Sequence, residues 1–118
     1  MYTLGEMDKI QALDSANLKL NSLICQPRIS SPKGNSFSTH TTISFTLDQL
    51  ANVTIKVYKV AGQLVEWLAR QQTFGSGKQV IRWDGRDSDG EVVATGLYIV
   101  TVTVGAQRQD KVVNVWNH

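Results

Sequence analysis

Several stretches of this chain alternate apolar and polar residues with a period of two, and this alternation limits the possible fold more than any other feature. In residues 41–47, Ile43 and Phe45 alternate with threonine and serine, and the same pattern recurs in residues 52–59 and 98–104. A period of two places the apolar residues on one face of a β-strand. Valine, isoleucine and threonine, which favour strands, make up 30 of the 118 residues. The pattern predicts an all-β chain.

Residues that favour turns divide the rest of the sequence into further short strands. The predicted strands are residues 18–25, 41–47, 52–59, 63–69, 78–83, 98–104 and 110–116, with a short extended piece at 92–93. A loop rich in serine, proline, glycine and asparagine covers residues 26–40. Val65 and Leu68 are both expected to be buried, and their odd spacing predicts a β-bulge. About seven antiparallel strands at these intervals are typical of a β-sandwich.

The first 17 residues differ in pattern from the rest. Apolar residues recur at every third position from Leu4 to Leu13, which is compatible with a short amphipathic helix or with a linker. We interpret residues 1–17 as a linker or the end of an upstream region and residues 18–118 as the sandwich. The N-terminus lacks the basic start and apolar run of a signal peptide. No stretch has the roughly 18 apolar residues of a membrane helix, so we expect no membrane insertion.

The charged, cysteine and histidine residues exclude several classes of function. A net charge of +2 is too small to favour a nucleic-acid partner. Cys25 is the only cysteine, so no disulfide can form within the chain. The two histidines, His40 and His118, form neither a nucleophile–base arrangement nor a zinc-binding cluster in the sequence. We therefore expect no catalytic residue, no metal ion and no cofactor.

An acidic stretch at residues 84–91 has some features of a calcium-binding loop. Asp87, Asp89 and Glu91 alternate as oxygen ligands would. However, the full spacing of a calcium loop is absent, and Arg86 stands among the acids. We favour a hairpin turn in which aspartate and glycine supply the tight backbone geometry.

Four aromatic residues fall into two groups. Trp83 alternates with Ile81 on a predicted strand, and we expect its side chain to lie in the core. Tyr58, Trp67 and Trp116 are candidates for the surface. Exposed aromatic rings on a sandwich can stack on sugars, or they can pack against a neighbouring domain.

The order of several motifs resembles a known family. The most specific part is Trp-Asp-Gly-Arg-Asp at residues 83–87, followed by Gly90 and by Gly-Leu-Tyr at residues 96–98. Further matching segments are residues 42–47, 53–58, 61–65 and 111–113. Together, over roughly residues 24–118, they resemble the FlgD-like Ig domain and the similar C-terminal sorting domains of proteins exported by type IX secretion.

The resemblance implies both a fold and a role. The fold would be an Ig-like β-sandwich, and the motif residues that would support it are Trp83, Asp84, Gly85, Asp87, Gly90, Gly96 and Tyr98. Such domains are non-catalytic and stand at the C-terminus of secreted or cell-surface bacterial proteins, so the export signal would lie outside this chain. Their partners would be other domains of the parent protein or neighbouring subunits. A type IX sorting domain, a carbohydrate-binding module and a self-assembling subunit remain open as alternatives.

Overall fold

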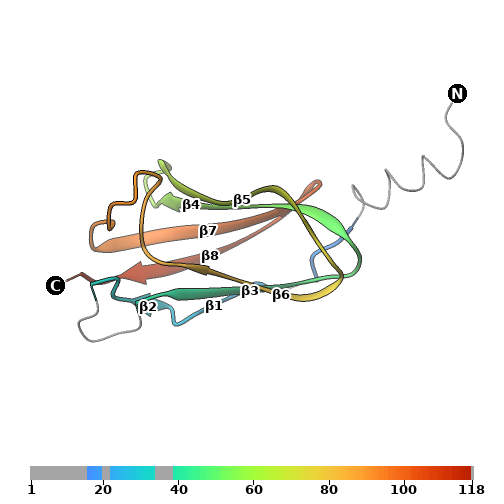
Figure 1. The fold of residues 1–118 in the computed structure, drawn as a ribbon, viewed down its shortest axis with the longest axis horizontal. Coiled ribbons are helices and arrows are strands. Elements are labelled where there is room, and N and C mark those ends of the chain that lie inside the picture. Colours follow the sequence, from blue (N-terminus) through green and yellow to red (C-terminus); the bar gives the residue numbers. More distant parts are fainter. Residues whose placement is uncertain (1–15, 20–21, 34–38, 118) are drawn as a thin grey trace, which may run out of the picture.

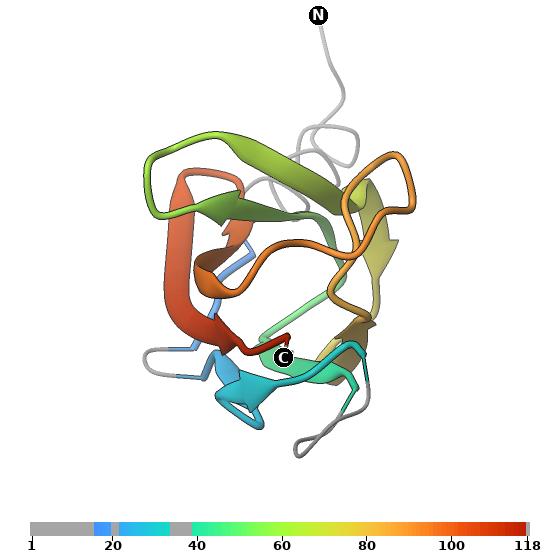
Figure 2. The same ribbon diagram turned by 90° about the vertical axis from the view of Figure 1, so that its left-hand side faces the viewer.

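The computed structural model describes residues 16–19, 22–33 and 39–117, and these residues form two facing β-sheets. The strands are β1 (Ile24–Gln26), β2 (Ile29–Ser30), β3 (Thr41–Leu47), β4 (Ala51–Lys59), β5 (Leu64–Phe74), β6 (Gly77–Trp83), β7 (Gly96–Val104) and β8 (Gln107–Val115). One sheet has the order β1-β3-β6, and the other has the order β2-β8-β7-β4-β5. Figure 1 shows the two layers from the side, and Figure 2 shows them along the length of the sandwich.

The predicted Ig-like β-sandwich is confirmed, with one strand more than expected. The additional strand, β2, pairs with the end of β8 in parallel, whereas the other neighbours are antiparallel. β2 falls inside the stretch predicted as the loop 26–40. Two residues cannot display a period, so the sequence pattern contains no signal for this strand. Among the described residues, no helix is long and apolar enough to cross a membrane.

The core lies between the inner faces of the two sheets. Its largest fully buried side chain is Trp83, at the end of β6. Alternate residues of β3, β4 and β7 supply most of the rest: Ile43, Phe45, Leu47, Val53, Ile55, Val57, Val100, Val102 and Val104. Phe45 also meets Phe74 edge to face, with ring centroids 5.6 Å apart. The period of two in the sequence is thus the pattern of burial in the sandwich.

The predicted bulge in β5 is confirmed, but the strand is longer than residues 63–69. Ile55 of β4 pairs with Ala69 and Lys56 pairs with Trp67, so Leu68 has no partner in the β4–β5 register. Two further register shifts occur between these strands. Residues 70–73 extend the strand although all four are exposed. A segment with no buried face shows no alternation, which is why the sequence did not indicate it.

The two ends of the described chain also differ from the prediction. β8 begins at Gln107 and not at residue 110 as predicted. Its first two residues are exposed, so no alternating pattern marked this part of the strand in the sequence. Within the predicted strand 18–25, the described residues form β1 and an isolated bridge between Leu18 and Leu47. Ala16 is buried in the core, on the N-terminal side of the boundary we place at residue 18. The predicted helix or linker at residues 1–17 lies almost wholly outside the described residues.

Candidate functional site

Trp83 and Tyr98 anchor the long loop between β6 and β7. Trp83 is 1% exposed, and its ring centroid lies 5.5 Å from that of Tyr98. The indole Nε1 donates a hydrogen bond to the carbonyl oxygen of Arg86 at 3.0 Å. The Tyr98 hydroxyl donates to the carbonyl oxygen of Ala94 at 2.7 Å. Both aromatic rings therefore pack on the core, and carbonyl oxygens of the loop accept the hydrogen bonds of their polar groups. These contacts give the two side chains a structural role.

The acidic residues of the loop hold its backbone. Asp84 Oδ1 accepts a hydrogen bond from the N–H of Arg86 at 3.2 Å. Asp87 Oδ1 accepts hydrogen bonds at 3.0 Å from the N–H groups of Asp89 and Glu91. Such aspartate-capped turns are what the sequence predicted in place of a calcium loop. Within the described ranges, no three histidine, cysteine, aspartate or glutamate side chains gather as metal ligands.

Three glycines complete the motif. Gly85 and Gly90 have positive φ angles of 74° and 81°, which L-residues rarely adopt. Gly85 is also buried against Pro32, so the loop and the segment before β3 approach closely there. Gly96 begins β7 and pairs with Val115 of β8. The seven motif residues therefore shape one loop and its supports.

The predicted surface aromatics separate into two places. Tyr58 and Trp67 lie on the neighbouring strands β4 and β5. Lys56, the register partner of Trp67, links them: its Nζ lies 4.4 Å from the Trp67 ring centroid and 6.0 Å from that of Tyr58. Arg70 also approaches Trp67, with its Cζ 4.6 Å from the centroid. We call Lys56, Tyr58, Trp67 and Arg70 the Trp67 cluster.

Trp116 does not belong to the Trp67 cluster. It follows β8, which is two positions from β4 in the sheet order. The backbone N–H of Trp116 donates a hydrogen bond to the carbonyl oxygen of Ser30. Its side chain is 46% exposed. Neither Lys56 nor Arg70 was predicted from the sequence as a site residue. The bulged register of β4 and β5 decides which side chains meet Trp67, and no local pattern reveals that register.

The Trp67 cluster borders a hollow in the molecular surface. Its lining residues are Thr54, Lys56, Trp67, Arg70, Gln71 and Thr103. Two cations and one large aromatic ring meet here, with threonine hydroxyls beside them. Neither Lys56 nor Arg70 makes an ion pair among the described residues. The arrangement can offer positive charge to a partner surface, with the two cations held against the aromatic ring.

The residues considered for nucleophilic chemistry, Cys25 and the two histidines, do not belong to the Trp67 cluster. Burial raises the pKa of the Cys25 thiol to about 11, although the charges of Lys111 and Arg28 act in the opposite direction. The thiol is therefore protonated at neutral pH, which makes it a poor nucleophile. The Nδ1 of His40 lies 2.8 Å from the hydroxyl oxygen of Thr39. His118 lies outside the described residues.

We expect Cys25 to react slowly with iodoacetamide while the chain is folded. A rise of the pKa from 9.0 to about 11 lowers the thiolate fraction at pH 8 about 100-fold. Alkylation followed by mass spectrometry should be slower by at least this factor in buffer than in concentrated urea. The rate should continue to increase with pH up to about 11, because only the thiolate reacts. Equal rates in buffer and urea would contradict the buried position of Cys25.

Comparisons with known proteins agree with the fold. The model of the FlgD Ig-like domain family matches residues 31–108. A comparison with curated proteins found no significant match. Among solved structures, dimeric latent PorU from Porphyromonas gingivalis is similar over 82% of this chain, with a TM-score of 0.57 and 19% identity. PorZ from the same organism is similar over 84%, with a TM-score of 0.54 and 19% identity.

The chain is short beside the two proteins from Porphyromonas gingivalis. It spans 9% of the PorU chain and 12% of the PorZ chain. FlgD from P. aeruginosa is similar over 87% of this chain and 72% of its own, with a TM-score of 0.51 and 17% identity. At these identities the structural likeness shows the fold alone. The family match, however, covers more than half of the 118 residues, and the chain therefore belongs to the FlgD Ig-like domain family.

Proposed function

We propose that the chain is a non-catalytic accessory module of a secreted or cell-surface bacterial protein. The module would contact another domain of that protein or a neighbouring subunit. The family supports an accessory role. PorZ is a bacterial surface component of the type IX secretion system, which favours a surface location. The chain corresponds to about a tenth of PorU or PorZ. This is the size expected of one module of a larger protein.

The Trp67 cluster is the observation that carries this proposal. Tryptophan, tyrosine and arginine are the residues that most often dominate the binding energy of protein interfaces. Here Lys56 and Arg70 lie within 4.6 Å of the Trp67 ring centroid, so the cations are held in place before a partner arrives. Preorganised side chains lose less conformational entropy on binding. The partner surface should carry carboxylates that face these cations.

The same geometry is less suitable for a sugar. A sugar stacks its apolar face directly on an aromatic ring, and the ring face must be accessible for this. At Trp67, the Lys56 Nζ and the Arg70 guanidinium already lie over the ring. We therefore favour a protein partner over a carbohydrate. The sorting role stays a prediction from the family resemblance, and self-assembly through residues 1–17 or an open sheet edge stays a prediction from the sequence.

Site-specific photo-crosslinking tests the proposal. A benzophenone amino acid would replace Trp67 in the full-length parent protein, produced in the bacterium that encodes it. The matched control carries the same amino acid at Arg82, which is exposed on β6 of the other sheet. We expect an adduct with another domain or a neighbouring subunit from position 67 and at most one fifth of that amount from position 82.

Three results would overturn the proposal. The first is the absence of a specific adduct from position 67 when the melting temperature of the variant shows that the domain is folded. The second is an adduct that contains only cytoplasmic proteins, which would contradict the surface location. The third is equal adducts from positions 67 and 82, which would assign no special role to the Trp67 cluster.

A further inference from the structure

β8 has an edge that no described strand covers along most of its length. β2 pairs only with Asn114 and Val115. The N–H of Asn114 donates to the carbonyl oxygen of Arg28 at 2.7 Å. Because backbone groups alternate sides along a strand, those of Asp110 and Val112 point toward the same edge. Among the described residues, no strand pairs with these two positions on the side of β8 that faces away from β7.

The β8 edge is regular, unlike the opposite edge of the same sheet. β8 pairs with β7 over nine consecutive positions without a register shift. β5, at the other edge, has three register shifts against β4. Bulges disturb the row of backbone donors and acceptors and so discourage the addition of another strand. Of the two edges, β8 is the one whose geometry allows a further strand to pair.

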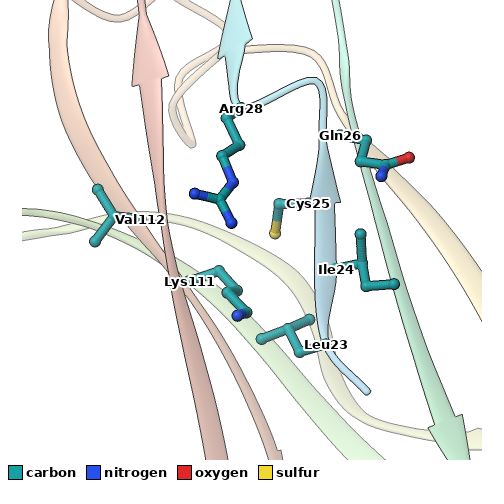
Figure 3. Close-up of a pocket in the computed structure, with 7 residues that line it drawn as sticks. All are labelled: Leu23, Ile24, Cys25, Gln26, Arg28, Lys111 and Val112. Carbon is teal, nitrogen blue, oxygen red and sulfur yellow. The ribbon is translucent and has the colours of Figure 1, made fainter. Parts of the chain in front are cut away.

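A positively charged hollow lies beside this edge, between β1 and β8. Figure 3 shows Arg28, Cys25 and Lys111 converging on the space between the strands, whereas Ile24 and Gln26 lie on the other side of β1. The seven lining residues are Leu23, Ile24, Cys25, Gln26, Arg28, Lys111 and Val112, with no acidic residue among them. Within the described ranges, neither Arg28 nor Lys111 makes an ion pair.

We infer that the β8 edge and this hollow bind an extended peptide that carries an acidic side chain. The peptide backbone would pair with Asp110 and Val112, as in other complexes that form by strand addition. Alternate side chains of an added strand point to the inner face of the sheet. One of them would therefore enter the hollow, where a carboxylate would meet Arg28 and Lys111. Charge-assisted hydrogen bonds from these two donors would give the site its preference for an acid.

Charge makes a second copy of the chain a poor occupant. If two β8 edges paired, the Arg28 and Lys111 side chains of both copies would gather at one interface. Like charges placed together on paired strands are destabilising. A lysine that points inward from an edge strand is a known device against self-association. The same lysine becomes favourable when the added strand supplies a carboxylate.

A peptide library tests the inference on the full 118-residue chain. The probe is a random heptapeptide library on phage, selected for binding to the chain and depleted on an Arg28→Gln/Lys111→Gln variant. We expect the recovered peptides to be enriched in aspartate or glutamate at one position between β-branched residues. Each single variant should weaken their binding about 3- to 10-fold. Lys78→Gln, an exposed change on β6, serves as the matched control and should leave binding unchanged.

Amide NMR spectra distinguish a peptide from a simple anion. The recovered peptide should shift the amide resonances of Asp110 and Val112, and its twin with glutamine in place of the acid should bind at least 10-fold more weakly. Recovery of no peptide that discriminates the double variant would overturn the inference. So would equal binding of the glutamine twin. If inorganic phosphate causes the same shifts and displaces the peptide, the hollow takes oxyanions in general and the peptide assignment is wrong.

Discussion

Replacing Trp83 with alanine will lower the free energy of unfolding by about 3–5 kcal/mol, the usual cost of deleting a large buried aromatic side chain. Trp83 is the largest fully buried residue of the core, and it packs on Tyr98 at the junction of the two sheets. Its removal leaves a cavity and also leaves the carbonyl oxygen of Arg86 without the indole donor. Both effects act on the long loop between β6 and β7.

Urea unfolding followed by far-ultraviolet circular dichroism would measure this loss. Trp116→Ala is the matched control, because Trp116 is 46% exposed. Its effect should stay below about 1 kcal/mol, as is usual for a surface substitution. Coincident midpoints for the Trp83→Ala variant and the parent chain would show that Trp83 does not anchor the core.

Gly85→Ala will lower the free energy of unfolding by about 2–5 kcal/mol. Gly85 has a φ of 74°, and an L-residue in this left-handed region costs about 1–2 kcal/mol. A Cβ at this position would overlap Pro32, lying 2.9 Å from its Cβ and still nearer to its Cγ. Since Pro32 is held in a rigid ring, the backbone of the loop must move, and overpacking of this kind costs about 1–3 kcal/mol.

Gly90→Ala separates the two contributions to this loss. Gly90 lies in the same loop with a similar φ of 81°, but nothing lies within 4 Å of the position that a Cβ would take there. This variant should lose only about 1–2 kcal/mol, from backbone strain alone. Equal losses for the two variants would show that the contact between Gly85 and Pro32 contributes nothing to stability.

In strands β3, β4 and β7, the buried face could be predicted from the local sequence pattern. In β3, β4 and β7 every second side chain is buried on the inner face, so a period of two was visible in the sequence. The ends of β5 and β8 have no such pattern because residues 70–73 and 107–108 are exposed on both faces. Only pairing with the neighbouring strand makes these residues part of a sheet, and pairing depends on residues that are distant in sequence.

The type of turn in the acidic loop could also be predicted from its sequence. Aspartate followed by glycine and a second aspartate favours a turn in which carboxylates accept backbone hydrogen bonds. The hydrogen bonds at Asp84 and Asp87 are of this type. What the sequence did not indicate is the close approach of Gly85 to Pro32, because 53 positions of chain separate the two residues.

The all-β class, the inner faces of the long strands and the family could be predicted from the sequence, because each depends on periods or motifs within a few residues. Which charged side chains meet depends on the tertiary fold. The bulged register between β4 and β5 places Lys56 beside Trp67. The separation of β1 and β2 into different sheets brings Arg28 toward Lys111 of β8. Both candidate surfaces thus arise from strand pairing, and the free energy of pairing is a property of the whole sandwich rather than of any local segment.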